Sequence, residues 1–205
     1  MVLVIGNKNY SSWSLRPWLA LKQLGIAFDE VRIPLYGSGA KEKLLQHSPA
    51  GKVPILKDGK TVVWDSLAIL EYLAERHPKL WPSDAGQRAR ARSVSAEMHS
   101  GFPNVRNHMS MNVRKRYPGK GRTPEVMAEI ERIKAIWSEA RGPFLFGDFT
   151  AADAMYAPVV LRFRTYDVAV NKPYMDAMLA LPAMKEWIEA AEREPESIPE
   201  FDLYG

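Results

Sequence analysis

Hydrophobic residues in the first 80 positions follow two periods in turn, and the alternation predicts strands and helices. Residues 2–5 are all apolar and end at Gly6, which predicts a buried strand. Residues 14–24 place apolar side chains at a helical spacing and end at Gly25, which predicts an amphipathic helix.

The same reasoning predicts five more elements in this half. They are strands at 28–33, 53–57 and 61–63, and helices at 40–47 and 65–76. The last two strands flank Asp58-Gly59, a common hairpin turn. The resulting order, β-α-β-α-β-β-α, predicts a thioredoxin-like α/β domain.

Helical periodicity alone continues through the rest of the chain. An apolar stripe predicts a long helix over 90–116, with a kink or break caused by Gly101 and Pro103. The stripe consists of Val94, Met98, Phe102, Val105, Met109 and Val113. Three further helices are predicted: one that starts at Thr123, one over 150–166 and one over 182–194. Residues 196–205 are predicted to form a terminal tail.

These elements predict an α/β thioredoxin-like N-terminal domain followed by an all-α C-terminal domain. The predicted parts are a domain at 1–80, a linker at 81–86 and a helical domain at 87–205. With 205 residues and 46% hydrophobic residues, the composition is typical of a soluble globular protein. No apolar run approaches the roughly 18 residues of a membrane span, and no basic leader precedes the first strand. A cytoplasmic location is expected.

Charge and cysteine content narrow the chemistry. The net charge is +4, and nine basic residues lie from Arg88 to Arg122, where Glu97 is the one acidic residue. Such a segment fits a solvated helix face, or the rim of a site for an acidic substrate. No aromatic-interleaved ribbon accompanies it, which weighs against a nucleic-acid partner. The absence of cysteine excludes a disulfide framework, a thiolate metal site and a protein thiol nucleophile.

A serine-rich corner at residues 10–16, YSSWSLR, lies where the first strand ends and the first helix begins. Free backbone N–H groups and the positive end of a helix favour an anion at such a point. A hydroxyl there can donate a hydrogen bond to a thiolate, carboxylate or phosphate. The alternative is that one serine simply caps the helix.

Three downstream segments extend the pattern: SPAGKVPIL at 48–56, WDSLAILEYL at 64–73 and FGDFTAAD at 146–153. In this order and spacing the chain resembles the cytosolic glutathione transferases. The first three motifs cover residues 1 to about 80, and the fourth lies in the second half. The SSxSxR form of the corner resembles the serine-type classes, including the zeta class of maleylacetoacetate isomerases.

The resemblance implies that Ser11 is the catalytic residue and activates the thiol of glutathione. Ser12 and Ser14 are alternatives, because neighbouring hydroxyls can substitute in a turn of unknown geometry. Tyr10 is a further rival, since other classes use a tyrosine near the amino end, although it could equally pack at the end of the strand. A free thiol has a pKa of about 8.5, so a lower pKa is needed for thiolate at neutral pH.

The resemblance also places glutathione itself. Val53 would pair with the cysteinyl backbone, and Pro54 would be cis, as in the family. Asp65 would take the γ-glutamyl amine and Ser66 the carboxylate, although the family usually has Glu or Gln at the first of these positions. Asp65 could also cap its helix. The glycine carboxylate would meet Lys52 or His47, unless both are solvated.

An electrophile pocket is expected between the serine corner and the helix at 90–116. Its candidate lining is Trp13, Phe102, Met109 and Met111, although an apolar stripe at helical spacing is more often core. Four arginines could bind an acidic co-substrate or simply lie on the surface: Arg106, Arg114, Arg162 and Arg164. Thr150 and Asp153 match a capping motif and are assigned to folding.

The predicted function is a glutathione transferase that conjugates glutathione, its co-substrate, to a small electrophile, without a metal, as a homodimer. One alternative is a glutathione-dependent cis–trans isomerase of the maleylacetoacetate isomerase type. Trp13 stands where that class typically has a cysteine. A second alternative is a non-catalytic ligand-binding protein of the same fold.

Overall fold

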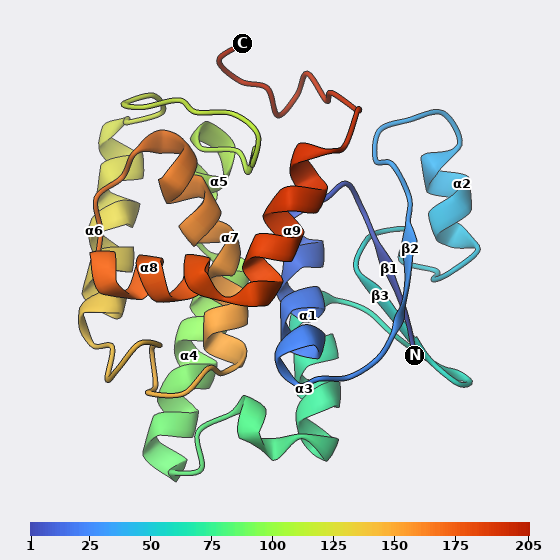
Figure 1. Cartoon of the computed structure of the whole chain (residues 1–205), viewed down its shortest axis with the longest axis horizontal. Coiled ribbons are helices and arrows are strands. Elements are labelled where there is room, and N and C mark those ends of the chain that lie inside the picture. Colours follow the sequence, from blue (N-terminus) through green and yellow to red (C-terminus); the bar gives the residue numbers. More distant parts are fainter.

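A small mixed sheet and the helices that cover it form the N-terminal domain in the computed structural model, which describes residues 1–205 (Figure 1). The strands are β1 (Val2–Ile5), β2 (Asp29–Arg32), β3 (Ile55–Asp58) and β4 (Thr61–Val63). Their order in the sheet is β2-β1-β3-β4, with β1 parallel to β2 and antiparallel to β3. The four predicted strands are confirmed: the first and last match in their bounds, the second is one residue shorter at each end, and the third runs over 55–58 instead of 53–57.

The central strand shows why the sheet is covered on both faces. Successive residues of a strand point to opposite sides. Leu3 and Ile5 accordingly belong to the main hydrophobic core, whereas Val4 packs in a smaller cluster with Ala40 and Leu44. The main-core face is covered by α1 (Ser12–Gln23) and α3 (Ser66–Arg76), and the other face by α2 (Ala40–Leu45). A continuous apolar run in β1 is therefore what two covered faces require.

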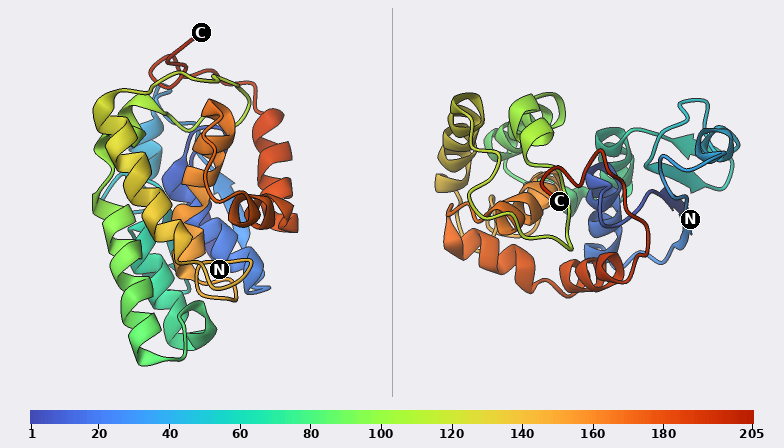
Figure 2. Two further views of the ribbon diagram at one scale, coloured as in Figure 1. Left: turned by 90° about the vertical axis from the view of Figure 1, so that its left-hand side faces the viewer. Right: turned by 90° about the horizontal axis from the view of Figure 1, so that it is seen from above.

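The second half is all helical and surrounds one buried helix (Figures 1 and 2). Its elements are η1 (Pro78–Leu80), α4 (Ala85–Ser100), α5 (Pro103–His108), α6 (Pro124–Ser138), α7 (Ala151–Tyr166), α8 (Lys172–Ala180) and α9 (Pro182–Glu192). Nearly every residue of α7 is buried, and this helix packs against α1 and α4. None of the helices has the length and apolarity that a bilayer span requires.

The predicted long helix at 90–116 is wrong in its second part. The break at Gly101 is confirmed, but helical structure ends at His108, and irregular chain follows up to α6. The backbone there bonds to distant partners instead of to its own turns. The Met109 carbonyl accepts from Arg162 Nε at 2.8 Å, and the Asn112 carbonyl accepts from the Thr165 hydroxyl at 2.9 Å. The helix α8 was not predicted.

The two halves meet along α1. This helix contacts α7 and α9 of the helical half as well as the sheet below it. Beyond α9, the chain crosses back over the turn between β1 and α1, as Figure 2 shows from above. The first helix and the turn that leads into it are thus enclosed by residues from both ends of the chain.

Candidate functional site

The serine corner forms the turn between β1 and the first residue of α1. Ser11 is the N-cap of this helix, and its N–H donates to the Asn7 carbonyl at 2.8 Å. Its hydroxyl lies 2.7 Å from the Ser14 hydroxyl, which also accepts the Gly6 N–H at 3.1 Å. Ser14 is completely buried. Ser12, which begins the helix, makes no side-chain hydrogen bond within the chain. Ser11 and Ser14 therefore form a relay from a backbone N–H to the helix end.

The Tyr10 hydroxyl is engaged by the C-terminal residues. It donates to Asp202 Oδ1 at 2.9 Å and accepts from Arg114 Nη2 at 3.1 Å and from the Ile198 N–H at 3.3 Å. The side chain is only 4% exposed and its ring stacks on Phe201. Because the hydroxyl already donates its one proton to Asp202, it has none free to donate to a thiolate. The arrangement fits the alternative that Tyr10 packs at the end of the strand.

A cavity of about 320 Å³ lies beside the start of α1 and brings together segments that are far apart in the sequence. Its lining residues are Trp13, Ala50, Lys52, Val53, Pro54, Trp64 and Asp65. The Val53–Pro54 peptide is cis, as the resemblance implied. The volume is that of a small-molecule site. Lys52, Val53, Pro54 and Asp65 thus line one cavity, whereas His47, Ser66 and the serines of the corner do not line it.

The N-terminus of α3 opens beside this cavity. Asp65 caps the helix, because its carboxylate accepts the Leu67 N–H at 2.9 Å. Ser66 is fully buried, and its hydroxyl accepts from Arg16 Nη1 at 3.2 Å. The proton of the Ser66 hydroxyl therefore remains free to be donated to an anion, next to the unpaired N–H groups of the first helical turn.

Arg16 adds a buried positive charge below the same helix end. It is 1% exposed, and its Nε has no hydrogen-bond partner. Burial lowers the pKa of Arg16 well below its usual range, and the nearby cations Arg106 and Arg162 lower it further, while Asp65 opposes this shift. A buried guanidinium without a full counter-ion favours an anion close by.

Trp13 is held rigidly at the edge of the cavity. The guanidinium carbons of Arg16 and Arg106 lie 4.4 and 5.0 Å from its ring centre. His99 of α4 packs edge-on against the same ring at 5.3 Å. The His99 Nε2 also lies 3.4 Å from Asp65 Oδ2, and burial lowers the pKa of this histidine. His99 thus links α4 of the helical half to Asp65 at the N-terminus of α3.

The other candidates for the electrophile pocket lie deeper. Phe102, Met109 and Met111 are buried in the main hydrophobic core and do not line the cavity beside Trp13. Their role as pocket residues stays a prediction that would require movement of the core.

Three of the four arginines expected at an acidic co-substrate donate hydrogen bonds to backbone carbonyls. Arg162 donates to the Met109 carbonyl, Arg106 to the carbonyls of Gly101 and Met98, and Arg114 to two carbonyls beyond α9. The Arg164 Nη1 has no partner. A buried donor that already serves a carbonyl has less capacity to bind a carboxylate.

The capping motif of α7 has the geometry of a folding element. The Asp153 carboxylate accepts the Thr150 N–H at 2.8 Å, the Thr150 hydroxyl at 3.0 Å and the Leu145 N–H at 2.9 Å. Complete burial raises the pKa of Asp153 to about 6, against these three donors. The carboxylate ties the preceding loop to the helix end, away from the cavity.

Three residues of this region carried no role in the sequence analysis: Arg16, His99 and Glu194, whose carboxylate accepts the N–H groups of Lys8 and Asn9 in the turn before Ser11. An arginine on the buried face of a predicted amphipathic helix is a signal that could have identified Arg16. His99 stands beside Met98 of the apolar stripe, but nothing local points it toward Asp65. Glu194 follows the last helix and has no pattern that indicates its burial.

Comparison with known proteins shows which family has a similar sequence and fold. Residues 10–76 match the glutathione S-transferase N-terminal domain, and residues 120–190 match the glutathione S-transferase C-terminal domain. A maleylacetoacetate isomerase of Rattus norvegicus is 31% identical over 190 residues, which cover 85% of each chain.

Solved structures share the fold at lower identity. A Burkholderia glutathione transferase homologue with bound glutathione superposes with a TM-score of 0.72 at 21% identity, covering 94% of this chain and 98% of that one. A bacterial maleyl pyruvate isomerase of the zeta class gives 0.71 at 23% identity, covering 97% and 100%. Both confirm a thioredoxin-like N-terminal domain followed by a helical C-terminal domain.

Proposed function

The chain belongs to the glutathione S-transferase family, and from this premise we propose that it binds glutathione as the thiolate and transfers it to a small electrophile. The observation that carries the proposal is the single cavity shared by Trp13, Lys52, cis Val53–Pro54 and Asp65, beside the N-termini of two helices. One helix begins at the serine corner and the other at Ser66.

Three features would hold the peptide. The N–H and C=O of Val53 pair with the cysteinyl unit, because the cis proline follows them. The γ-glutamyl carboxylate accepts hydrogen bonds from the Ser66 hydroxyl and from the N–H groups of the first turn of α3, near the buried Arg16. The γ-glutamyl ammonium meets Asp65, and the glycine carboxylate meets Lys52.

Thiol activation is assigned to Ser11. If Ser14 accepts from the Gly6 N–H and donates to Ser11, the Ser11 proton is free to be donated to sulfur. Lowering a thiol pKa by two units takes roughly 2.7 kcal/mol. A hydrogen bond to a charged group supplies about 1.5–3 kcal/mol, and a helix N-terminus about 0.3–1 kcal/mol. The relay and the start of α1 are together sufficient.

The reaction then needs little more than placement. The thiolate sulfur donates its electron pair to an electrophilic carbon and forms a C–S bond. Either a leaving group departs with the bonding pair, or an activated double bond takes up the pair and is protonated by water. Holding both reactants in one site removes most of the entropic barrier of a bimolecular step.

An isomerase is the second candidate, and the name of the Rattus norvegicus relative favours it. In that reaction the thiolate adds to one carbon of a cis double bond, the resulting single bond rotates, and the thiolate leaves again. A dicarboxylic substrate would need free cations at the cavity, whereas the lining offers one, Lys52, which the glycine carboxylate of glutathione would use. Arg106, Arg114 and Arg162 do not line the cavity and already donate to carbonyls. Conjugation is therefore the leading proposal.

The first experiment compares Ser11→Ala with Ser12→Ala. Glutathione is titrated into each protein by calorimetry, and the ultraviolet absorbance of the thiolate is recorded against pH. We expect all three proteins to bind glutathione, with a higher thiol pKa in Ser11→Ala alone. A raised pKa in Ser12→Ala alone would move activation to Ser12. No binding by the parent at millimolar glutathione would refute the proposal.

Conjugation and isomerisation differ in what happens to glutathione. A conjugation consumes one free thiol for each product molecule, whereas an isomerisation returns it. Free thiol is therefore titrated during turnover of an activated aryl halide and of a cis-enedione carboxylic acid. Loss of thiol with the first substrate supports the transferase, and turnover of the second at constant thiol supports the isomerase.

A homodimer is proposed on the strength of family membership. Light scattering should then give twice the chain mass of 23.2 kDa. The mass of a single chain at micromolar concentration would refute the dimer.

A further inference from the structure

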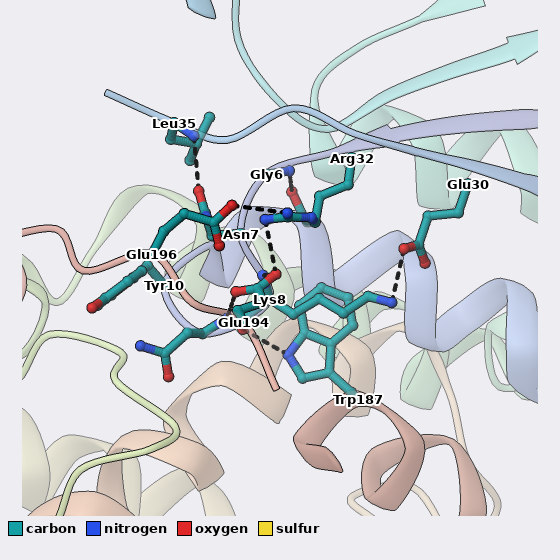
Figure 3. Close-up of polar contacts among 12 residues, drawn as sticks. Gly6, Asn7, Lys8, Tyr10, Glu30, Arg32, Leu35, Trp187, Glu194 and Glu196 are labelled. Carbon is teal, nitrogen blue, oxygen red and sulfur yellow. Dashed lines mark hydrogen bonds and ion pairs between the residues drawn. The ribbon is translucent and has the colours of Figure 1, made fainter. Parts of the chain in front are cut away.

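The turn that precedes Ser11 is held from outside by a single buried carboxylate. Glu194 Oε1 accepts the Lys8 N–H at 2.7 Å (Figure 3). Its Oε2 accepts the Asn9 N–H at 3.0 Å. The Glu194 side chain is 7% exposed, and it lies 186 residues from Lys8 in the sequence. Two adjacent N–H groups on one carboxylate form a small anion-binding nest inside the protein.

The remaining polar groups of this turn are bound by the same half of the chain. The Lys8 carbonyl accepts from Trp187 Nε1 at 3.0 Å. The Asn9 carbonyl accepts the Val113 N–H at 3.3 Å. In its side chain, Nδ2 donates to Asn112 Oδ1 and Oδ1 accepts the Arg114 N–H, both at 3.0 Å. Lys8 and Asn9 therefore have no backbone hydrogen bond to the N-terminal domain that contains them.

The charge on Glu194 is only partly balanced. Arg32 Nη1 approaches Oε1 at 3.5 Å, while its Nη2 pairs with Glu196 at 2.8 Å. Lys8 Nζ turns away and pairs with Glu30 at 2.8 Å. Burial raises the pKa of Glu194, and the two N–H groups and Arg32 oppose this shift. The two backbone donors are thus the main partners of this carboxylate.

Displacing the turn would displace the hydroxyl that follows it. Ser11 donates its N–H to the Asn7 carbonyl, so both ends of the five-residue turn from Asn7 to Ser11 are fixed to each other. Since Lys8 and Asn9 lie between these ends, the carboxylate that fixes them also fixes the direction of Ser11. The glutathione-binding residues Val53, Asp65 and Ser66 belong to other segments and do not depend on Glu194.

We infer that Glu194 is a positioning residue for thiol activation, through which the chain beyond α9 completes the site. This rests on the proposed function, because it assumes that Ser11 acts on glutathione. Its removal should separate two quantities that a general loss of stability would change together. Affinity for glutathione should persist, while the thiolate fraction and kcat should fall.

The test uses the full chain with Glu194→Gln. The amide keeps the shape of the side chain but offers only one acceptor oxygen to two donors. Glu196→Gln is the matched control, since it also pairs with Arg32 but makes no contact with the Lys8 or Asn9 N–H. The measurements are the glutathione Kd, the pH dependence of thiolate absorbance in the complex, and kcat with KM for an aryl halide.

We expect Glu194→Gln to bind glutathione within about twofold of the parent, with the thiol pKa raised by about one unit and kcat lowered roughly tenfold. Glu196→Gln should match the parent in all three. A parent-like thiol pKa and kcat in Glu194→Gln would overturn the inference, and so would equal damage in both variants. If Glu194→Gln does not fold by circular dichroism, Glu194→Asp is measured with the same criteria. A parent that binds glutathione without thiolate would instead contradict the proposed function.

Discussion

Tyr10→Phe separates the two roles that the sequence leaves open for this residue. The change removes one oxygen atom and keeps the ring that stacks on Phe201. Three contacts disappear: the bond donated to Asp202, the bond accepted from Arg114 and the weaker bond accepted from the Ile198 N–H. All of them belong to the connection between the turn and the C-terminal residues.

The size of the loss follows from what each partner retains. Asp202 still accepts from Asn112, and Arg114 still serves two backbone carbonyls. A hydrogen bond that involves a charged group contributes about 1.5–3 kcal/mol at most, and less where the partner keeps other bonds. The Ile198 N–H loses its one partner, which costs about 1 kcal/mol or more. We expect the free energy of unfolding of Tyr10→Phe to be about 2–4 kcal/mol lower than that of the parent.

Urea denaturation followed by circular dichroism measures that loss, and the thiolate absorbance of the glutathione complex is recorded beside it. The expected pair of results is a lower midpoint at unchanged slope, with a thiol pKa equal to that of the parent. A raised thiol pKa without loss of stability would refute the reasoning. It would mean that Tyr10, and not the serine relay, faces the sulfur.

Two further predictions concern buried polar groups. In Ser14→Ala the Gly6 N–H loses its acceptor, so the free energy of unfolding should fall by about 1–3 kcal/mol. The pKa of the glutathione thiol should rise at unchanged glutathione Kd, and a parent-like thiol pKa would exclude the relay through Ser11 and Ser14. The pKa of Asp153 is raised from 3.8 to about 6, so its protonated form stabilises the fold fully below about pH 4, and this contribution is lost as the pH rises through about 6. Relative to Asp153→Asn, the parent should lose about 3 kcal/mol between pH 4 and 7 in urea denaturation, and a flat difference would show that its three donors outweigh burial.

The sequence predicts the parts of the site that are short and local. A proline after a valine and an aspartate before a helical run carry their geometry within a few residues, and the structure places Val53, Pro54 and Asp65 around one cavity. The serine corner is local in the same sense, since a hydroxyl at the start of an amphipathic helix is visible as such. The order of helices and strands along the first 80 residues also follows from the local periodicity.

What the sequence does not reveal depends on contacts between distant segments. Arg16 meets Ser66 across 50 residues, and Glu194 meets Lys8 across 186. Neither pairing is indicated by a periodic pattern or a characteristic spacing in the sequence. The end of helix at His108 has the same origin, because the apolar stripe continues while tertiary partners such as Arg162 take the carbonyls that a helix would use.

The enclosure of the first turn by the last helix has a consequence for biosynthesis. A ribosome releases β1 and α1 long before α9 and Glu194 exist, so the earliest segment to emerge waits longest for its partners. During that interval the N–H groups of Lys8 and Asn9 have only water to bind. A nascent chain that ends before Glu194 therefore cannot form the two hydrogen bonds that hold the turn before Ser11, even when its sheet has formed.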